Sequence, residues 1–277
     1  MYFLQNAFIW LRKIIIRILF KQYPNFLLKS KSIKRNPTKK INFISSTNNF
    51  WVSRQMYQKW NSYTVNKKIN LNIYSDEQVD QFMKKYFKND LIFEIYKKSM
   101  IPVQKIDIFR ICSTFIFGGI WLDLKSEVNL IKVINQYQKS NEKGILMYEP
   151  RKIEVVKYVQ KRYKKDFKNV IHNGFYYLPE KSIYLEKIIQ KIERDYLYFQ
   201  DILFSFPKQG MMNLTGPHQF TRSFYELNKK DQPRLVTHHD IDWNYCSKYG
   251  EFLSPLKISK HYSLLRNLKT IDSNKAN

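Results

Sequence analysis

The stretch Lys105–Val128, KIDIFRICSTFIFGGIWLDLKSEV, decides the fold that we expect for this chain. Its first half, residues 106–117, is mostly apolar and long enough for a helix. Asp107 and Arg110 are three residues apart, so on a helix they lie on one face. The pair Gly118-Gly119 is typical of a helix end. We therefore predict a helix that carries an acid and a base and ends at the two glycines.

A short strand is predicted directly after this helix. The run Ile120–Leu124, IWLDL, is rich in strand-forming residues and contains an acid. If the strand continues, Asp123, Lys125 and Glu127 share one face, because side chains alternate. Ligands of open α/β sheets bind beyond the carboxyl ends of strands. An acid there needs a cation or a donor to offset its desolvation. The pattern fits a ligand site, and it equally fits a surface acid beside a structural ion pair.

The same residues resemble the sugar-binding DXD region of glycosyltransferase family 32. Asp107-x-x-Arg110, followed by the run GGIWLD at residues 118–123, is similar to that family's D-x-x-R and G-G-x-Y-x-D-x-D. One departure is Lys125, which stands where the family's second acid usually is. The resemblance covers roughly residues 40–265. It implies an α/β fold of the GT-A type, with a Rossmann-like mixed sheet flanked by helices.

The resemblance also implies an activity and a set of site residues. The expected enzyme is a hexosyltransferase that moves a sugar, with retention of configuration, from a nucleotide-sugar donor to a glycan or lipid-linked acceptor. The expected role is bacterial capsule or lipopolysaccharide synthesis. Asp123 and Asn173 are the expected catalytic residues, and Asp107 and Arg110 are expected to hold the sugar hydroxyls. The further expected substrate-binding residues are Gly119, Lys125, Thr215, Gly216 and His261.

A divalent cation is part of this expectation. Asp123 is the expected ligand of Mn²⁺ or Mg²⁺, since such hard ions prefer oxygen. A charged lysine cannot ligate a metal, but the ammonium of Lys125 can neutralise a phosphate. Two outcomes stay open: Asp123 binds the ion together with water and the diphosphate, or metal dependence is weakened.

The net charge of +25 implies an anionic partner, although part of the excess reflects a biased composition. We expect an anionic membrane surface and a phosphorylated donor. No groove-reading motif is present, so nucleic acid is not expected. A basic nucleic-acid-binding protein and an inactive transferase-like membrane protein are the alternatives. Cys112 and Cys246 form no C-x-x-C pair, and Cys112 is expected in the core.

Three segments are expected along the chain. Residues 1–40 form a basic amphipathic helix and a linker, which would hold the protein at the cytoplasmic face of the cell membrane without spanning it. Packing of this helix on the protein's own core is the alternative. Residues 41–265 form the transferase domain, and residues 266–277 form a frayed tail.

Further elements follow from pattern. Strands are expected at Ile41–Ser45, Leu71–Tyr74, Gly144–Glu149 and Val170–Tyr177, and helices at Trp51–Trp60, Gln78–Phe87 and Ser182–Leu197. Ser75 is expected to cap a helix, and Ile183 and Leu197 are expected to face inward. The loop Thr215-Gly216-Pro217 resembles a family segment whose backbone N–H groups approach phosphate or sugar. The cluster His238-His239-Asp240-x-Asp242 is either a metal site or an ordinary loop.

Overall fold

The computed structural model describes residues 41–47, 60, 62–63, 69–149, 170–245 and 265–275. Several predictions lie outside these residues: the membrane segment 1–40, most of the helix at Trp51–Trp60, the basic segment 151–169, Cys246 and His261. Within the described part of the chain, no helix is both long and apolar enough to cross a membrane.

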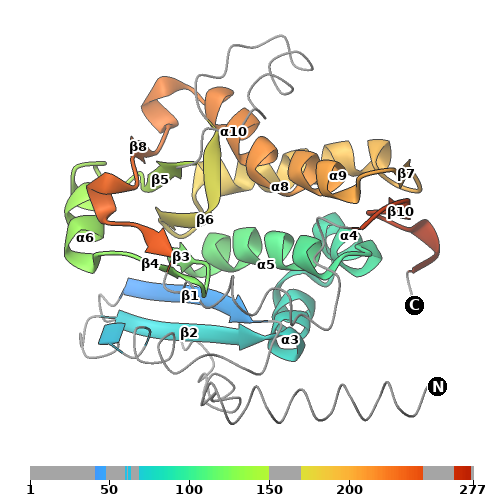
Figure 1. The fold of residues 1–277 in the computed structure, drawn as a ribbon, viewed down its shortest axis with the longest axis horizontal. Coiled ribbons are helices and arrows are strands. Elements are labelled where there is room, and N and C mark those ends of the chain that lie inside the picture. Colours follow the sequence, from blue (N-terminus) through green and yellow to red (C-terminus); the bar gives the residue numbers. More distant parts are fainter. Residues whose placement is uncertain are drawn as a thin grey trace.

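A six-stranded mixed sheet forms the centre of the molecule (Figure 1). The strand order is β2-β1-β3-β6-β5-β8. The strands are β1 (Ile41–Thr47), β2 (Ile69–Ser75), β3 (Gly119–Leu122), β5 (Ile145–Tyr148), β6 (Ile171–Leu178) and β8 (Arg234–Val236). β1 pairs in parallel with β2 and β3, and β5 with β8, whereas β6 is antiparallel to β3 and β5. The carboxyl ends of five strands therefore meet at one edge, where β6 begins.

Helices flank this sheet, which confirms the expected α/β class with a mixed sheet between helices (Figure 1). They are α3 (Asp76–Phe87), α4 (Leu91–Lys98), α5 (Pro102–Phe117), α6 (Leu130–Gln138), α8 (Ile183–Asp195), α9 (Pro207–Leu214) and α10 (Pro217–Tyr225). The 3₁₀ turns are η2 (Tyr196–Tyr198), η3 (Lys229–Asp231), η4 (His239–Ile241) and η7 (Ser273–Lys275). Two small ladders pair β4 (Ser126–Glu127) with β9 (Asn244–Tyr245), and β7 (Leu203–Phe204) with β10 (Leu268–Lys269).

The sheet separates two apolar cores, one on each face, because successive side chains of a strand point to opposite faces. Trp121 and Tyr176 belong to one core, which also contains residues of α3, α4, α5, α8 and α10. Leu122 and Phe175 belong to the other, which contains Val133 of α6. In Figure 1, α5 lies beside β3, while α6 lies at the other flank from α8–α10. Both faces of the sheet are thus covered, and its carboxyl edge is left for a site.

Local sequence explains where the helices around the site begin and end. Ser75 caps α3 as expected, in a box in which Ser75 Oγ accepts from Gln78 N–H at 3.3 Å and Gln78 Oε1 accepts from Ser75 N–H at 2.9 Å. Helix α5 begins at Pro102, earlier than expected, because proline is well suited to the first turn. It ends at Gly118, whose φ of 60° favours glycine.

Two predictions about the outer parts of the fold are wrong. Ile183 and Leu197 are 56% and 63% exposed rather than inward-facing. Leu197 lies beyond the last residue of α8, in η2, so the helical periodicity no longer applies to it. The segment expected to be a frayed tail packs in the fold instead, since Leu268–Lys269 pairs with β7 and Ile271 is fully buried.

Candidate active site

The chain turns sharply after β3, at the carboxyl edge of the sheet. Asp123 donates its backbone N–H to the Gly174 carbonyl at 2.9 Å, and Ser126 N–H donates to the Asp123 carbonyl at 2.8 Å. The strand therefore stops at Leu122, and the next residues form a turn. The prediction that Asp123, Lys125 and Glu127 share one strand face is wrong, because a backbone hydrogen bond closes the turn between them.

Two aromatic residues hold this turn from a segment between β1 and β2. Trp60 Nε1 donates to the Leu124 carbonyl at 2.8 Å. The Tyr63 hydroxyl donates to the Val128 carbonyl at 3.2 Å and accepts from Val128 N–H at 3.1 Å. We name these contacts the Trp60–Tyr63 clamp. It fixes both ends of the turn that carries Lys125.

The second part of the site is a bulge at the start of β6. Leu146 of β5 stands opposite Tyr176, but the next residue, Met147, stands opposite His172. The run Asn173–Phe175 therefore leaves the ladder with β5. Bulges of this kind bend a strand and re-aim its side chains. Here the bulge moves Asn173 toward α5 and β3.

A buried polar cluster joins the bulge to α5 and the loop before α10. Asp107 Oδ1 lies 3.1 Å from Arg110 Nη2 and accepts from Asn173 Nδ2 at 3.3 Å, while its Oδ2 accepts from Thr215 Oγ1 at 3.3 Å. Arg110 Nη1 donates to the Asn173 carbonyl at 2.6 Å and lies 3.6 Å from Asp123 Oδ1. Five residues predicted from separate parts of the sequence thus meet at one place.

The cluster has an inner and an outer layer. The side chains of Asp107 and Arg110 are only 6% and 7% exposed, whereas that of Asp123 is 27% exposed. Asp123 is therefore the carboxylate that a ligand can reach from solvent. The inner pair lies behind it and fixes its electrostatic surroundings.

Burial raises the pKa of Asp107 to about 6. The Arg110 guanidinium opposes this rise, and the nearby Asp123 carboxylate adds to it. The hydrogen bonds from Thr215 and Asn173 favour the ionised form and lower the pKa. Desolvation dominates because Asp107 has almost no contact with solvent.

Trp121 orients the Asp123 carboxylate. Its indole Nε1 donates to Asp123 Oδ1 at 3.1 Å. The Arg110 guanidinium lies 5.1 Å from the Trp121 ring centroid, a cation–π distance. Oδ1 thus faces an indole donor and a guanidinium, and Oδ2 is the oxygen left to meet a ligand.

The residues do not fit a divalent ion held by protein ligands alone. Mg²⁺ and Ca²⁺ sites need several oxygen ligands around the ion. Among the described residues, no three or more histidine, cysteine, aspartate or glutamate side chains are grouped so as to hold a metal ion. The Asp123 oxygen that accepts from Trp121 also faces Arg110. The side chain at position 125 is an exposed lysine rather than a second carboxylate.

Gly119 and the loop at Thr215 and Gly216 were predicted to bind substrate, but in the structure they contact other parts of the protein. Gly119 lies at the opposite end of β3 from Asp123, and a Cβ there would be 2.2 Å from the Asn42 carbonyl oxygen, so Gly119 is required for strand packing. The N–H groups of Thr215 and Gly216 both donate to the Met211 carbonyl at 2.9 Å. They are already satisfied within the protein and do not point to a phosphate.

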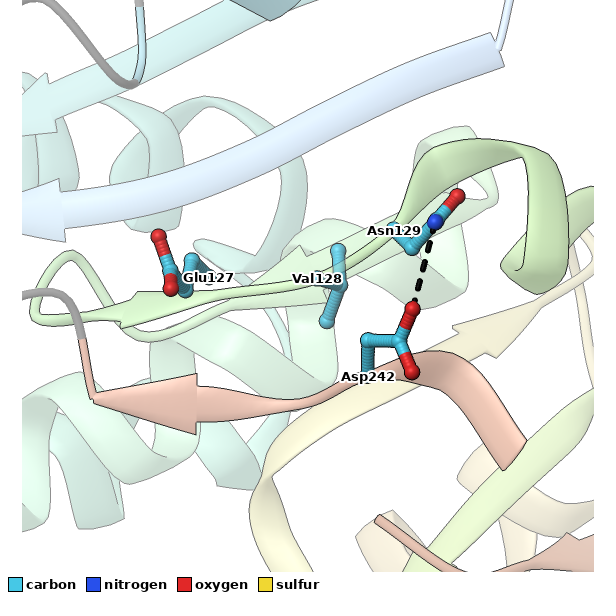
Figure 2. Close-up of a pocket in the computed structure, with 4 residues that line it drawn as sticks. All are labelled: Glu127, Val128, Asn129 and Asp242. Carbon is cyan, nitrogen blue, oxygen red and sulfur yellow. Dashed lines mark hydrogen bonds between the residues drawn. The ribbon is translucent and has the colours of Figure 1, made fainter. Parts of the chain in front are cut away.

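A pocket of about 310 Å³ lies beyond the turn, lined by Glu127, Val128, Asn129 and Asp242 (Figure 2). Figure 2 shows Asn129 and Asp242 facing each other, with Asn129 Nδ2 donating to Asp242 Oδ2 at 3.2 Å. Asp242 also pairs with Lys132 at 2.7 Å. Asp240 accepts from Thr237 N–H and Oγ1. The acids of the His238–Asp242 segment are thus held by other partners, which favours the ordinary loop over the metal site.

A carboxylate–imidazole pair lies at the same sheet edge as Asp123. Glu149 directly follows β5, and His172 is the second residue of β6, directly before the bulge. Glu149 Oε2 lies 2.7 Å from His172 Nδ1, and both side chains are 11% exposed. The His172 ring packs edge-to-face against Trp243, with 5.1 Å between centroids.

The chain is similar to solved structures, although no family model matches it. No family model matches the chain, and no curated protein matches its sequence. Among solved structures, the chain is similar to the PaToxG glycosyltransferase, with 15% sequence identity and a TM-score of 0.44 over 78% of each chain.

Sequence reasoning missed the Trp60–Tyr63 clamp and the Glu149–His172 pair. Nothing in the local pattern around Trp60 and Tyr63 indicates contacts more than sixty residues away. A signal for Glu149 did exist, because an acid at the carboxyl end of a predicted strand lies at the same edge as Asp123.

Proposed function

We propose that the protein is a glycosyltransferase that takes a sugar from a nucleotide-sugar donor. The observation that carries the proposal is the polar cluster at the carboxyl edge of the sheet. Asp107, Arg110, Asn173 and Thr215 form its inner layer behind the solvent-facing Asp123. These are the residues that resemble the family's sugar-binding region, and they meet where α/β sheets bind ligands.

In this proposal, Asp123 contacts the donor, and Asn173 lies beside the reacting sugar. The C1–O bond to the diphosphate breaks, a bond forms between C1 and the acceptor oxygen, and the acceptor proton leaves on a diphosphate oxygen. Fixed positive charge near a leaving diphosphate lowers the barrier, because that group gains charge in the transition state. Lys125, which is exposed in the turn after Asp123, would supply this charge. Retention of configuration is proposed from the family resemblance.

Lys125 leads us to propose that metal dependence is weak. Of the two outcomes left open by the sequence, the lysine at position 125 favours the second, since it stands where the family's second acid usually is. Mn²⁺ or Mg²⁺ would then raise activity only modestly. Lys125 would do most of the charge neutralisation.

The acceptor and location are also proposals. We propose a glycan or lipid-linked acceptor of a bacterial surface polysaccharide, a capsule or a lipopolysaccharide. Residues 1–40 would hold the protein peripherally on the cytoplasmic face of the cell membrane, through one apolar helix face and basic residues. No nucleic acid partner is proposed.

The test is a screen of nucleotide sugars by thermal shift, followed by donor hydrolysis and transfer assays. A donor at a hundred times its Kd stabilises the fold by about 2.7 kcal/mol. Asp123→Asn is the matched control, because it removes one charge and keeps the shape. We expect the wild type to bind and turn over at least one donor, and the variant to fold but lose turnover. Normal turnover in Asp123→Asn would remove Asp123 from the site. Absence of any donor binding by the wild type would overturn the proposal.

A further inference from the structure

His172 is a buried histidine whose two ring nitrogens have different surroundings. The residue as a whole is 8% exposed, so it lies almost wholly inside the fold. Nδ1 is bonded to Glu149, but Nε2 is buried and meets no hydrogen-bond partner within the part of the chain that the structure describes. Buried polar atoms are nearly always paired, and an exception in a folded protein points to a strained or functional site.

Glu149 decides which nitrogen of the neutral ring carries the hydrogen. An ionised carboxylate can only accept hydrogen bonds. At 2.7 Å from Glu149 Oε2, Nδ1 must therefore donate. The lone pair of the neutral ring is then on Nε2. In its neutral form, His172 thus presents at Nε2 an acceptor whose direction is fixed by the carboxylate behind the ring.

Gly174 places this acceptor beside Asp123. A Cβ on Gly174 would lie 2.6 Å from His172 Nε2 and 2.9 Å from Asp123 Oδ2. The two atoms can therefore be at most 5.5 Å apart, the sum of these distances. Any side chain at position 174 would fill the space between them. Glycine at such a place allows a close approach to the backbone.

We propose that His172 Nε2 and Asp123 Oδ2 together bind neighbouring hydroxyl groups of the transferred sugar over Gly174. Each atom accepts one hydrogen bond, and the Glu149 carboxylate keeps His172 in the accepting tautomer. This inference rests on the proposed function, because it assigns a specificity-determining contact in the same site. The substrate class is a nucleotide sugar with two adjacent free hydroxyls on the face that meets Gly174.

The physical reason is the balance of hydrogen bonds before and after binding. A hydroxyl that donates to Nε2 pairs an acceptor that has no partner in the unliganded protein. A deoxy sugar leaves Nε2 without a partner. Sites built to hydrogen-bond a hydroxyl discriminate strongly against analogues that lack it. For one such bond we expect a loss of roughly 10- to 100-fold in affinity.

The experiment uses two variants that distinguish the roles of the two ring nitrogens of His172. In His172→Asn the amide can still donate to Glu149, but nothing replaces Nε2. In His172→Gln the longer side chain places a polar atom near the Nε2 position. The probes are UDP-glucose, GDP-mannose and their 2-, 3-, 4- and 6-deoxy forms, with free UDP and GDP as controls. Affinities are measured by calorimetry on the full chain, with circular dichroism and Tm for each variant.

We expect one deoxy form of the bound sugar nucleotide to lose roughly 10- to 100-fold in affinity for the wild type and little for His172→Asn. Free UDP or GDP should bind the wild type and His172→Asn equally, and His172→Gln should recover part of the discrimination. A purely structural effect of the variant would weaken the binding of all ligands alike. Comparing wild type and variant, each with the sugar nucleotide and its deoxy form, therefore separates a structural effect from loss of the hydroxyl contact. Equal loss for every deoxy form, or none, would overturn the inference while leaving the proposed function standing. Binding of neither sugar nucleotides nor free nucleotides by the wild type would overturn both.

Discussion

The Trp60–Tyr63 clamp gives the sharpest stability prediction. Tyr63→Phe keeps the ring, which is 5% exposed, and removes only the hydroxyl. Without it, the buried Val128 loses the donor to its carbonyl and the acceptor of its N–H. A buried polar group left without a partner costs about 1–3 kcal/mol. Because the backbone can relax, we expect a total near the lower end of two such losses, about 2–4 kcal/mol.

The assay is urea unfolding with a matched tyrosine. In Tyr137→Phe the lost hydroxyl donates to the Glu142 carbonyl at 3.3 Å in an exposed contact, so the change should stay within about 0.5 kcal/mol. At unchanged m-value, Tyr63→Phe should lower the midpoint clearly and Tyr137→Phe should not. Donor affinity should fall more in Tyr63→Phe, since the turn that carries Lys125 is no longer fixed. Equal midpoints for the two variants would refute the idea that the clamp holds the turn.

Three further predictions concern the site and the membrane. Burial raises the pKa of Asp107 from 3.8 to about 6, so the folded state binds this proton more tightly than the unfolded state. The wild type should therefore lose roughly 3 kcal/mol of stability from this group as pH rises from about 4 to 6. In unfolding measured at several pH values, Asp107→Asn should make the free energy of unfolding depend less on pH. An unchanged slope of this free energy against pH would contradict the raised pKa of Asp107. Gly174→Ala should abolish donor binding, because a Cβ at position 174 would collide with His172 and Asp123. Gly210→Ala, away from the site, should leave donor binding intact. Equal donor binding by the two variants would refute the idea that the donor lies close to the Gly174 backbone. A chain from residue 41 onward should float less with anionic liposomes than the full chain, and equal flotation, or loss of the fold, would place residues 1–28 in the core instead.

The sequence predicted the residues of the polar cluster better than the ends of the elements that carry them. Asp107, Arg110 and Asp123 could be named together because a helix, a glycine pair and a strand follow one another within a short stretch, and local periodicity governs such stretches. The end of β3 was misplaced because the apolar alternation of IWLDL continues past the point where the backbone bond from Ser126 to Asp123 closes the turn.

Contacts between distant segments could not be predicted from the same patterns. The partners of Trp60 and His172 are set by the tertiary packing of the turn and by the β6 bulge, and neither has a local signature. The N–H groups of Thr215 and Gly216 were expected to face a ligand, but their bonds to the Met211 carbonyl depend on how α9 ends. Propensity and pattern say little about which backbone groups remain free.

Helix α5 constrains how this protein can change. Eight consecutive residues, Asp107–Thr114, are buried, so the helix is enclosed around its whole circumference. Most replacements there would alter packing as well as chemistry, and alanine scanning of the segment would confuse folding with activity. Under the proposed function, new sugar preferences would therefore arise more readily in the β6 bulge and in the loops after β3 and β5. Directed evolution of this chain should start from libraries in those loops and leave α5 fixed.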